Sequence, residues 1–183
     1  MKIKNLIARY AIVIILALLF PVFYTIFTPL TLYPVYLILN LFYSVNLDKT
    51  TLMINGSSIN LIKACIAGSA YFLLAILNFS TPKIRKRFYA LAFSLVSFLL
   101  VNILRIVILS ILFLSDFRYF TETHLVSWYL LTAVFVLLIW LLTIKVFEIK
   151  EIPFYSDIIL IKMLIKKESF YKKDSIKKLR RNK

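Results

Sequence analysis

The chain has 183 residues, of which 62% are hydrophobic and 17% are charged, and its formal net charge is +15. Soluble domains are about 45–50% apolar, so this composition indicates an integral membrane protein. With one cysteine and one histidine, the chain can form neither an intrachain disulfide nor a cysteine- or histidine-rich metal site, and we expect no metal and no cofactor.

The positive charge is concentrated toward the C-terminal end. Twelve of the 23 Lys and Arg residues lie between Lys145 and Lys183. Such a tail suits either nucleic acid or anionic lipid headgroups, and in so apolar a chain we expect lipid and no nucleic acid. We therefore divide the chain into a membrane-embedded domain over residues 1–147 and a basic cytoplasmic tail over residues 148–183, partly amphipathic or disordered.

Apolar runs long enough to cross a membrane, which takes about 20 residues, follow one another along the chain. Residues 10–27 predict the first transmembrane helix, whereas residues 30–45 either cross or lie re-entrant or along the interface. The later runs are residues 66–79, 88–114 and 124–147. We expect an all-α polytopic membrane protein with about four to five transmembrane helices, and four suffice if residues 30–45 do not cross.

A polar segment separates the second and third apolar runs. Asn55-Gly56 lies there, between the β-prone residues 52–54 and 59–61. Asn-Gly is the strongest short hairpin signal, because both central residues of a type I′ turn need φ above zero. We expect a small extracytoplasmic β-hairpin before the helix that carries the cysteine, outside the hydrocarbon layer, where water reaches its edges.

The charges between the apolar runs predict the orientation. Residues 83–87 hold four cations in a short loop, and the positive-inside rule places such a loop in the cytoplasm. The helix before the loop then begins outside, together with the hairpin, and the last helix returns the basic tail to the inside. The prediction is a multi-pass protein of the cell membrane with both termini in the cytoplasm.

Three chemically active residues are expected at one level, near the outer interface. Cys65 and His124 begin apolar runs there, and Arg105 lies about 25 Å along a helix that starts inside. Each alone has an ordinary interpretation: a small buried hydrophobe, an interfacial histidine, and an arginine that extends to the headgroups. An ionisable residue within an apolar span is energetically costly, and the shared level favours a common site.

Two further residues accompany these three. Asn102 lies three residues before Arg105, on the same helix face, and Trp128 lies four residues after His124. Asn102 is expected either to orient Arg105 or to bind substrate, and Trp128 to line the site. The positive end of a helix and a nearby arginine both favour the thiolate form of Cys65.

Ala64-Cys65 followed by small residues and a membrane helix, then Asn102-x-x-Arg105, then His124 opening a further helix, resembles the exosortase/archaeosortase family in its small archaeal form. The resemblance covers about residues 50–140. The family often has Ala-Cys-Ser-Gly, whereas Gly68-Ser69 is shifted in this chain. The resemblance implies a membrane cysteine peptidase or transpeptidase with Cys65 as nucleophile, His124 as general base and acid, and Arg105 stabilising the thiolate or the oxyanion.

The resemblance also implies the partners. These are surface proteins with a C-terminal Pro-containing motif, a transmembrane helix and a basic cluster. Cleavage at the motif on the outer membrane face precedes transfer of the new C-terminus to an acceptor, for which a lipid is expected and water is the alternative. Apart from the resemblance, the sequence leaves open a non-catalytic membrane assembly factor or a small transporter, in which Cys65 is dispensable.

Overall fold

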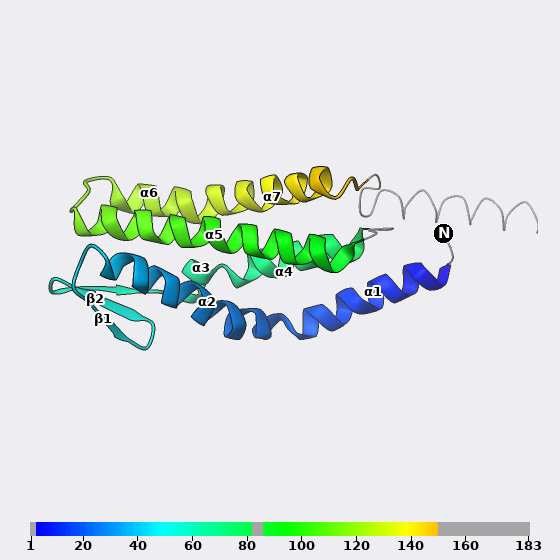
Figure 1. Ribbon diagram of the computed structural model, residues 1–183, viewed down its shortest axis with the longest axis horizontal. Helices are drawn as coiled ribbons and strands as arrows, with labels where there is room; N and C mark the ends of the chain where they lie inside the picture. The colour runs from blue at the N-terminus through cyan, green and yellow to red at the C-terminus, as the bar shows by residue number, and fades with distance from the viewer. Residues whose placement is uncertain (1–2, 82–85, 150–183) are drawn as a thin grey trace, which may run out of the picture.

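The computed structural model describes residues 3–81 and 86–149 of the chain, so the predicted tail lies almost wholly outside the described residues. Long helices form a bundle with a small sheet at one end (Figure 1). In chain order, the elements are α1 (Ile3–Leu18), α2 (Phe20–Asn40), β1 (Val45–Asp48), β2 (Thr51–Ile54), β3 (Ser57–Asn60), α3 (Lys63–Ile66), α4 (Gly68–Ser80), α5 (Arg87–Leu114), α6 (Phe120–Val126), the π-helical η1 (Ser127–Leu131) and α7 (Thr132–Val146).

Four helices in the described part of the chain are long and apolar enough to cross a membrane. They are Phe20–Asn40, Lys63–Ser80, Arg87–Leu114 and Phe120–Val146. Their outer surfaces expose large apolar side chains, among them Leu37 at 61% and Leu100 at 63%. Such surfaces are compatible with a lipid environment, and the mostly helical architecture with four candidate spans agrees with the prediction.

The first two apolar runs divide differently from the prediction. We expected one helix over residues 10–27 and a separate segment over residues 30–45, whereas α1 ends at Leu18 and α2 continues to Asn40. Together α1 and α2 extend along the bundle as one bent rod that ends beside the sheet (Figure 1). Residues 30–45 are therefore not a helix of their own, and only four candidate spans occur among the described residues.

Prolines explain where the first helix breaks. Pro21 occupies the first turn of α2, where its missing N–H is tolerated, but it cannot donate a hydrogen bond back into α1. The break accordingly falls at Leu19. Pro29 and Pro34 lie inside α2 without ending it, as is common in apolar helices packed against neighbours.

The sheet contains three antiparallel strands in the order β1-β2-β3. Asn55 and Gly56 connect β2 to β3 with φ values of 48° and 82°, which confirms the predicted hairpin and its turn. The strand β1 was not predicted, because Val45 was assigned to the end of an apolar run. Lys49, with φ of 52°, forms the turn between β1 and β2.

Aromatic packing holds the bundle together beneath the sheet. The ring of Tyr71 on α4 is fully buried. It stacks on Phe27 of α2 with centroids 3.6 Å apart and meets Phe98 of α5 edge-on at 4.9 Å. Aromatic pairs of this kind contribute about 0.5–1.5 kcal/mol each beyond their buried area, so Tyr71 fixes α2, α4 and α5 relative to one another.

Candidate active site

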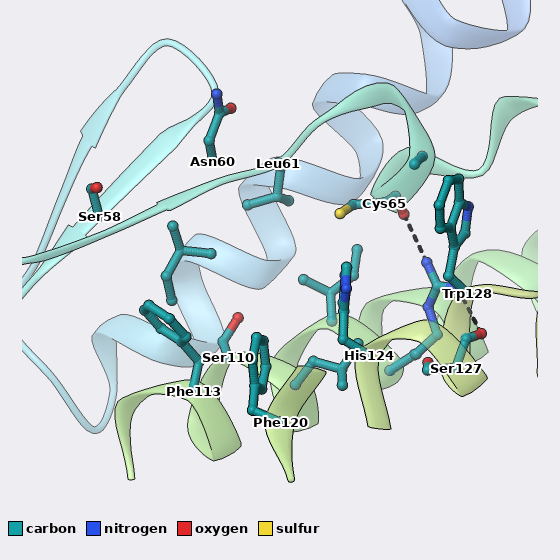
Figure 2. Close-up of a pocket in the computed structure, with 15 residues that line it drawn as sticks. Ser58, Asn60, Leu61, Cys65, Ser110, Phe113, Phe120, His124, Ser127 and Trp128 are labelled. Carbon is teal, nitrogen blue, oxygen red and sulfur yellow. Dashed lines mark hydrogen bonds between the residues drawn. The ribbon is translucent and has the colours of Figure 1, made fainter. Parts of the chain in front are cut away.

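A pocket of about 180 Å³ opens at the sheet end of the bundle. Cys65, Arg105, His124 and Trp128 line it, although they come from distant parts of the chain, and Figure 2 shows the side chains around it. The other lining residues are Ser58, Ile59, Asn60, Leu61, Ala64, Ile106, Leu109, Ser110, Phe113, Phe120 and Ser127. The structure therefore brings together four of the five residues that the sequence selected.

Cys65 lies on α3, a single helical turn. Ala67 ends this turn with φ of 57°, a left-handed conformation that is uncommon for a residue with a side chain. The chain changes direction there, and the carbonyls of Cys65 and Ile66 are left at the end of α3. The N–H of Cys65 donates to the carbonyl of Ile62 at 2.9 Å, so this amide is not free to donate to an oxyanion.

Asn102 and Arg105 bind the carbonyl groups at the end of α3. Asn102 Nδ2 donates to the carbonyl oxygens of Cys65 at 3.1 Å and Ile66 at 3.3 Å. Arg105 Nη2 donates to the carbonyl oxygen of Cys65 at 3.1 Å. Asn102 is 2% exposed and is not among the pocket-lining residues, so it supports Cys65 from behind and has no access to a substrate in the pocket.

The other terminal nitrogen of the Arg105 guanidinium, Nη1, bonds to the last helical segment of the bundle. Arg105 Nη1 donates to Thr132 Oγ1 at 2.6 Å and to the carbonyl oxygen of Ser127 at 3.4 Å. Ser127 is the first residue of η1, the π-helical stretch between α6 and α7, and Thr132 directly follows it. Single π turns often occur at functional sites, and this one was not predicted because nothing in the residue types marks it.

Cys65 and His124 both face the pocket (Figure 2). No hydrogen bond joins these two side chains, both of which belong to the described chain. The imidazole of His124 instead stacks on Phe120, with centroids 5.7 Å apart and an interplanar angle of 17°. Catalytic hydrogen bonds are often long before substrate binds, so the arrangement suits a base that engages the thiol in the bound state.

Gly68 lets α2 approach the segment that carries Cys65. A Cβ atom at this position would lie 2.7 Å from the ring of Tyr24 on α2, which is too close for any side chain without movement of that ring. The same ring has the ammonium of Lys63 at 6.0 Å from its centroid. Close packing with Tyr24 therefore accounts for the position of the glycine after the cysteine.

The pocket combines a thiol, an imidazole and a guanidinium. Arg105 is 9% exposed, and no carboxylate in the described chain forms an ion pair with it. Its positive charge is consequently not neutralised beside Cys65. Comparison with models of protein families, with curated proteins and with solved structures finds no match for this chain.

Proposed function

We propose that this protein is a membrane-embedded cysteine peptidase or transpeptidase of the exosortase/archaeosortase type. One observation carries the proposal: Cys65, Arg105 and His124 reach one pocket from three helices that are far apart in sequence. A nucleophile, a base and a cation in a partly enclosed pocket are the groups that acyl transfer through a thioester needs.

The reaction proceeds in two halves. The imidazole of His124 takes the proton of Cys65, and the thiolate attacks a peptide carbonyl of the substrate. The C–N bond breaks as the imidazolium returns the proton to the leaving amine, which leaves the N-terminal part of the substrate on Cys65 as a thioester. A hydroxyl or amine of the acceptor then gives its proton to His124 as it attacks the thioester, the acyl group passes to the acceptor as the C–S bond breaks, and the imidazolium returns the proton to the released thiolate.

Arg105 acts through its charge and through the position it gives Cys65. Both of its Nη atoms already donate to protein oxygens, so it stabilises the thiolate and the oxyanion mainly as an unneutralised cation in a place of low dielectric constant. Asn102 complements it by holding the carbonyls of Cys65 and Ile66.

The charge distribution supports an active site on the extracytoplasmic side of the cell membrane, with both termini in the cytoplasm. At the end of the bundle far from the sheet, four basic residues, Arg9, Lys86, Arg87 and Lys145, occur with one described carboxylate, Glu148. At the sheet end, three cations are offset by three carboxylates, since Lys49, Lys63 and Arg118 occur with Asp48, Asp116 and Glu122. This asymmetry follows the positive-inside rule. The proposed substrates are surface proteins with the C-terminal signal described above, and the proposed acceptor is a membrane lipid.

The proposal is tested with a reporter protein that ends in a Pro-containing motif, an apolar helix and a basic cluster, co-expressed with the full chain. Wild-type protein should shorten the reporter, whereas Cys65→Ser and His124→Ala should abolish processing. Ser69→Ala, an exposed neighbour outside the pocket, serves as the matched control and should process normally. Normal processing by Cys65→Ser would instead show that Cys65 is not the nucleophile, and failure of wild type to shorten any such reporter would favour a non-catalytic protein.

A further inference from the structure

The open edge of β3 borders the pocket. β3 is at the end of the sheet order, so only its side toward β2 has a strand partner in the described chain. Ser58, Ile59 and Asn60 all line the pocket. Successive side chains of a strand point to opposite faces of a sheet, so consecutive residues lining one pocket indicate that the strand's backbone edge faces it.

The strand register identifies which backbone groups lie on this edge. Residues that flank a two-residue hairpin loop form a hydrogen-bonded pair, and hydrogen-bonded and non-hydrogen-bonded pairs then alternate. Ser57 flanks the loop and pairs with Ile54. Ser57 and Ile59 therefore bond to β2, whereas Ser58 and Asn60 direct their backbone N–H and C=O groups away from it.

Three of these four groups remain available. The carbonyl of Asn60 accepts a hydrogen bond from the N–H of Ile62 at 3.1 Å. The N–H and C=O of Ser58 and the N–H of Asn60 have no backbone partner in the described chain. Two donors and one acceptor in a row match the backbone of an extended peptide, whereas a helix bonds its own backbone internally.

We propose that an extended segment of the substrate adds to β3 as a fourth strand and so presents its scissile carbonyl to Cys65. This inference rests on the proposed function. Figure 2 shows the chain passing from Asn60 through Leu61 into the turn that carries Cys65, so a peptide paired with β3 runs alongside the nucleophile. Backbone pairing supplies affinity, and the apolar pocket walls receive alternate side chains of the peptide.

Ser58→Pro tests the pairing directly. Proline removes the N–H of Ser58 from the open edge and places its ring there, while the bonds between β2 and β3 remain because Ser58 pairs with Met53 in a non-hydrogen-bonded position. We expect processing of the reporter to fall about tenfold or more. If Ser58→Pro processes the reporter as well as an active wild type does, the substrate does not pair with β3. The proposed function would be unaffected by that result.

Leu47→Pro is the matched control, since it makes the same backbone change on the opposite edge of the sheet. Leu47 on β1 also occupies a non-hydrogen-bonded position, opposite Leu52, and it does not line the pocket. We expect it to process the reporter within about twofold to threefold of wild type. Thermal melting in detergent checks that both variants are folded.

Cross-linking tests the pairing without any need for cleavage. Ser58→Cys is combined with Cys65→Ala, and the reporter carries single cysteines at successive positions around its motif. Oxidation should give disulfides at every second reporter position, because paired strands alternate their side chains. Equal cross-linking at consecutive positions, or none at any position, would contradict strand addition whether or not the reporter is cleaved.

Discussion

Arg105 is the residue that connects the parts of the pocket. Its two Nη atoms reach the carbonyl of Cys65 on α3 and the hydroxyl of Thr132 on α7, so one side chain on α5 fixes two other segments. A planar guanidinium can do this because its donors point in fixed, separate directions, whereas a lysine ammonium has a single donor centre. Arg105 thus holds Cys65, the proposed nucleophile, through its backbone carbonyl.

Thr132→Val tests this connection with little change in side-chain volume. It leaves Arg105 Nη1 with the longer contact to Ser127 only. Hydrogen bonds to charged groups contribute about 1.5–3 kcal/mol, so we expect the free energy of unfolding in detergent to fall by about 2 kcal/mol and processing to fall about tenfold.

Thr143→Val provides the control for that change. Thr143 is a buried threonine on the same helix, and its hydroxyl donates to the carbonyl of Ile139 at 2.7 Å, far from the pocket. We expect Thr143→Val to process the reporter as wild type does. Equal loss of activity in the two variants would show that the Arg105 contact has no special importance.

At the scale of elements, the break between α3 and α4 determines how Cys65 is presented. A continuous helix would bond the carbonyls of Cys65 and Ile66 internally, and Asn102 and Arg105 would then have no acceptors at these positions. The left-handed Ala67 exposes both carbonyls. Gly68, directly after it, allows the ring of Tyr24 to close the packing.

Gly68→Ala tests that packing. The added methyl group meets the Tyr24 ring, and overpacking of this kind costs about 1–3 kcal/mol, so the melting temperature in detergent should fall. Combination with Tyr24→Ala should remove most of this penalty, because the second substitution opens the space. If the two destabilisations simply add, the contact between Tyr24 and Gly68 does not restrict the size of residue 68.

Sequence patterns predicted the elements that depend on local chemistry. Asn55-Gly56 predicted its turn because few other residue pairs adopt positive φ easily. Apolar length predicted the later helices, and depth along them predicted that Cys65, Arg105 and His124 belong to one site.

Features that depend on tertiary contacts could not be predicted in this way. The strand β1 was not predicted because its first residue, Val45, was assigned to the end of the apolar run over residues 30–45. The π-helical η1 has no residue signature, and Asn102 lies behind Cys65 because of a left-handed alanine whose conformation the sequence does not reveal. These are places where packing decides between local alternatives that differ little in free energy.

At the scale of the whole molecule, the sheet and the link between α5 and α6 occupy one end of the bundle, and the chain near residues 81 and 86 occupies the other (Figure 1). Residues of β3 line the pocket, so it lies at the sheet end. The proposed orientation places the first end outside the cell. A membrane-impermeant maleimide added to intact cells should therefore label Cys65. The variant Lys86→Cys, combined with Cys65→Ala, should react only after permeabilisation. If Cys65 reacts only after permeabilisation and the cysteine of Lys86→Cys reacts in intact cells, the orientation is the reverse of the one proposed.

The central claim is that Cys65 becomes covalently attached to the substrate. Mass spectrometry after rapid acid quenching of the full chain with the reporter measures this most directly. The account predicts a thioester between Cys65 and the N-terminal fragment of the reporter, released by hydroxylamine and absent in Cys65→Ser. Processing of the reporter by wild type with no adduct on Cys65, together with equal processing by Cys65→Ser, would contradict it.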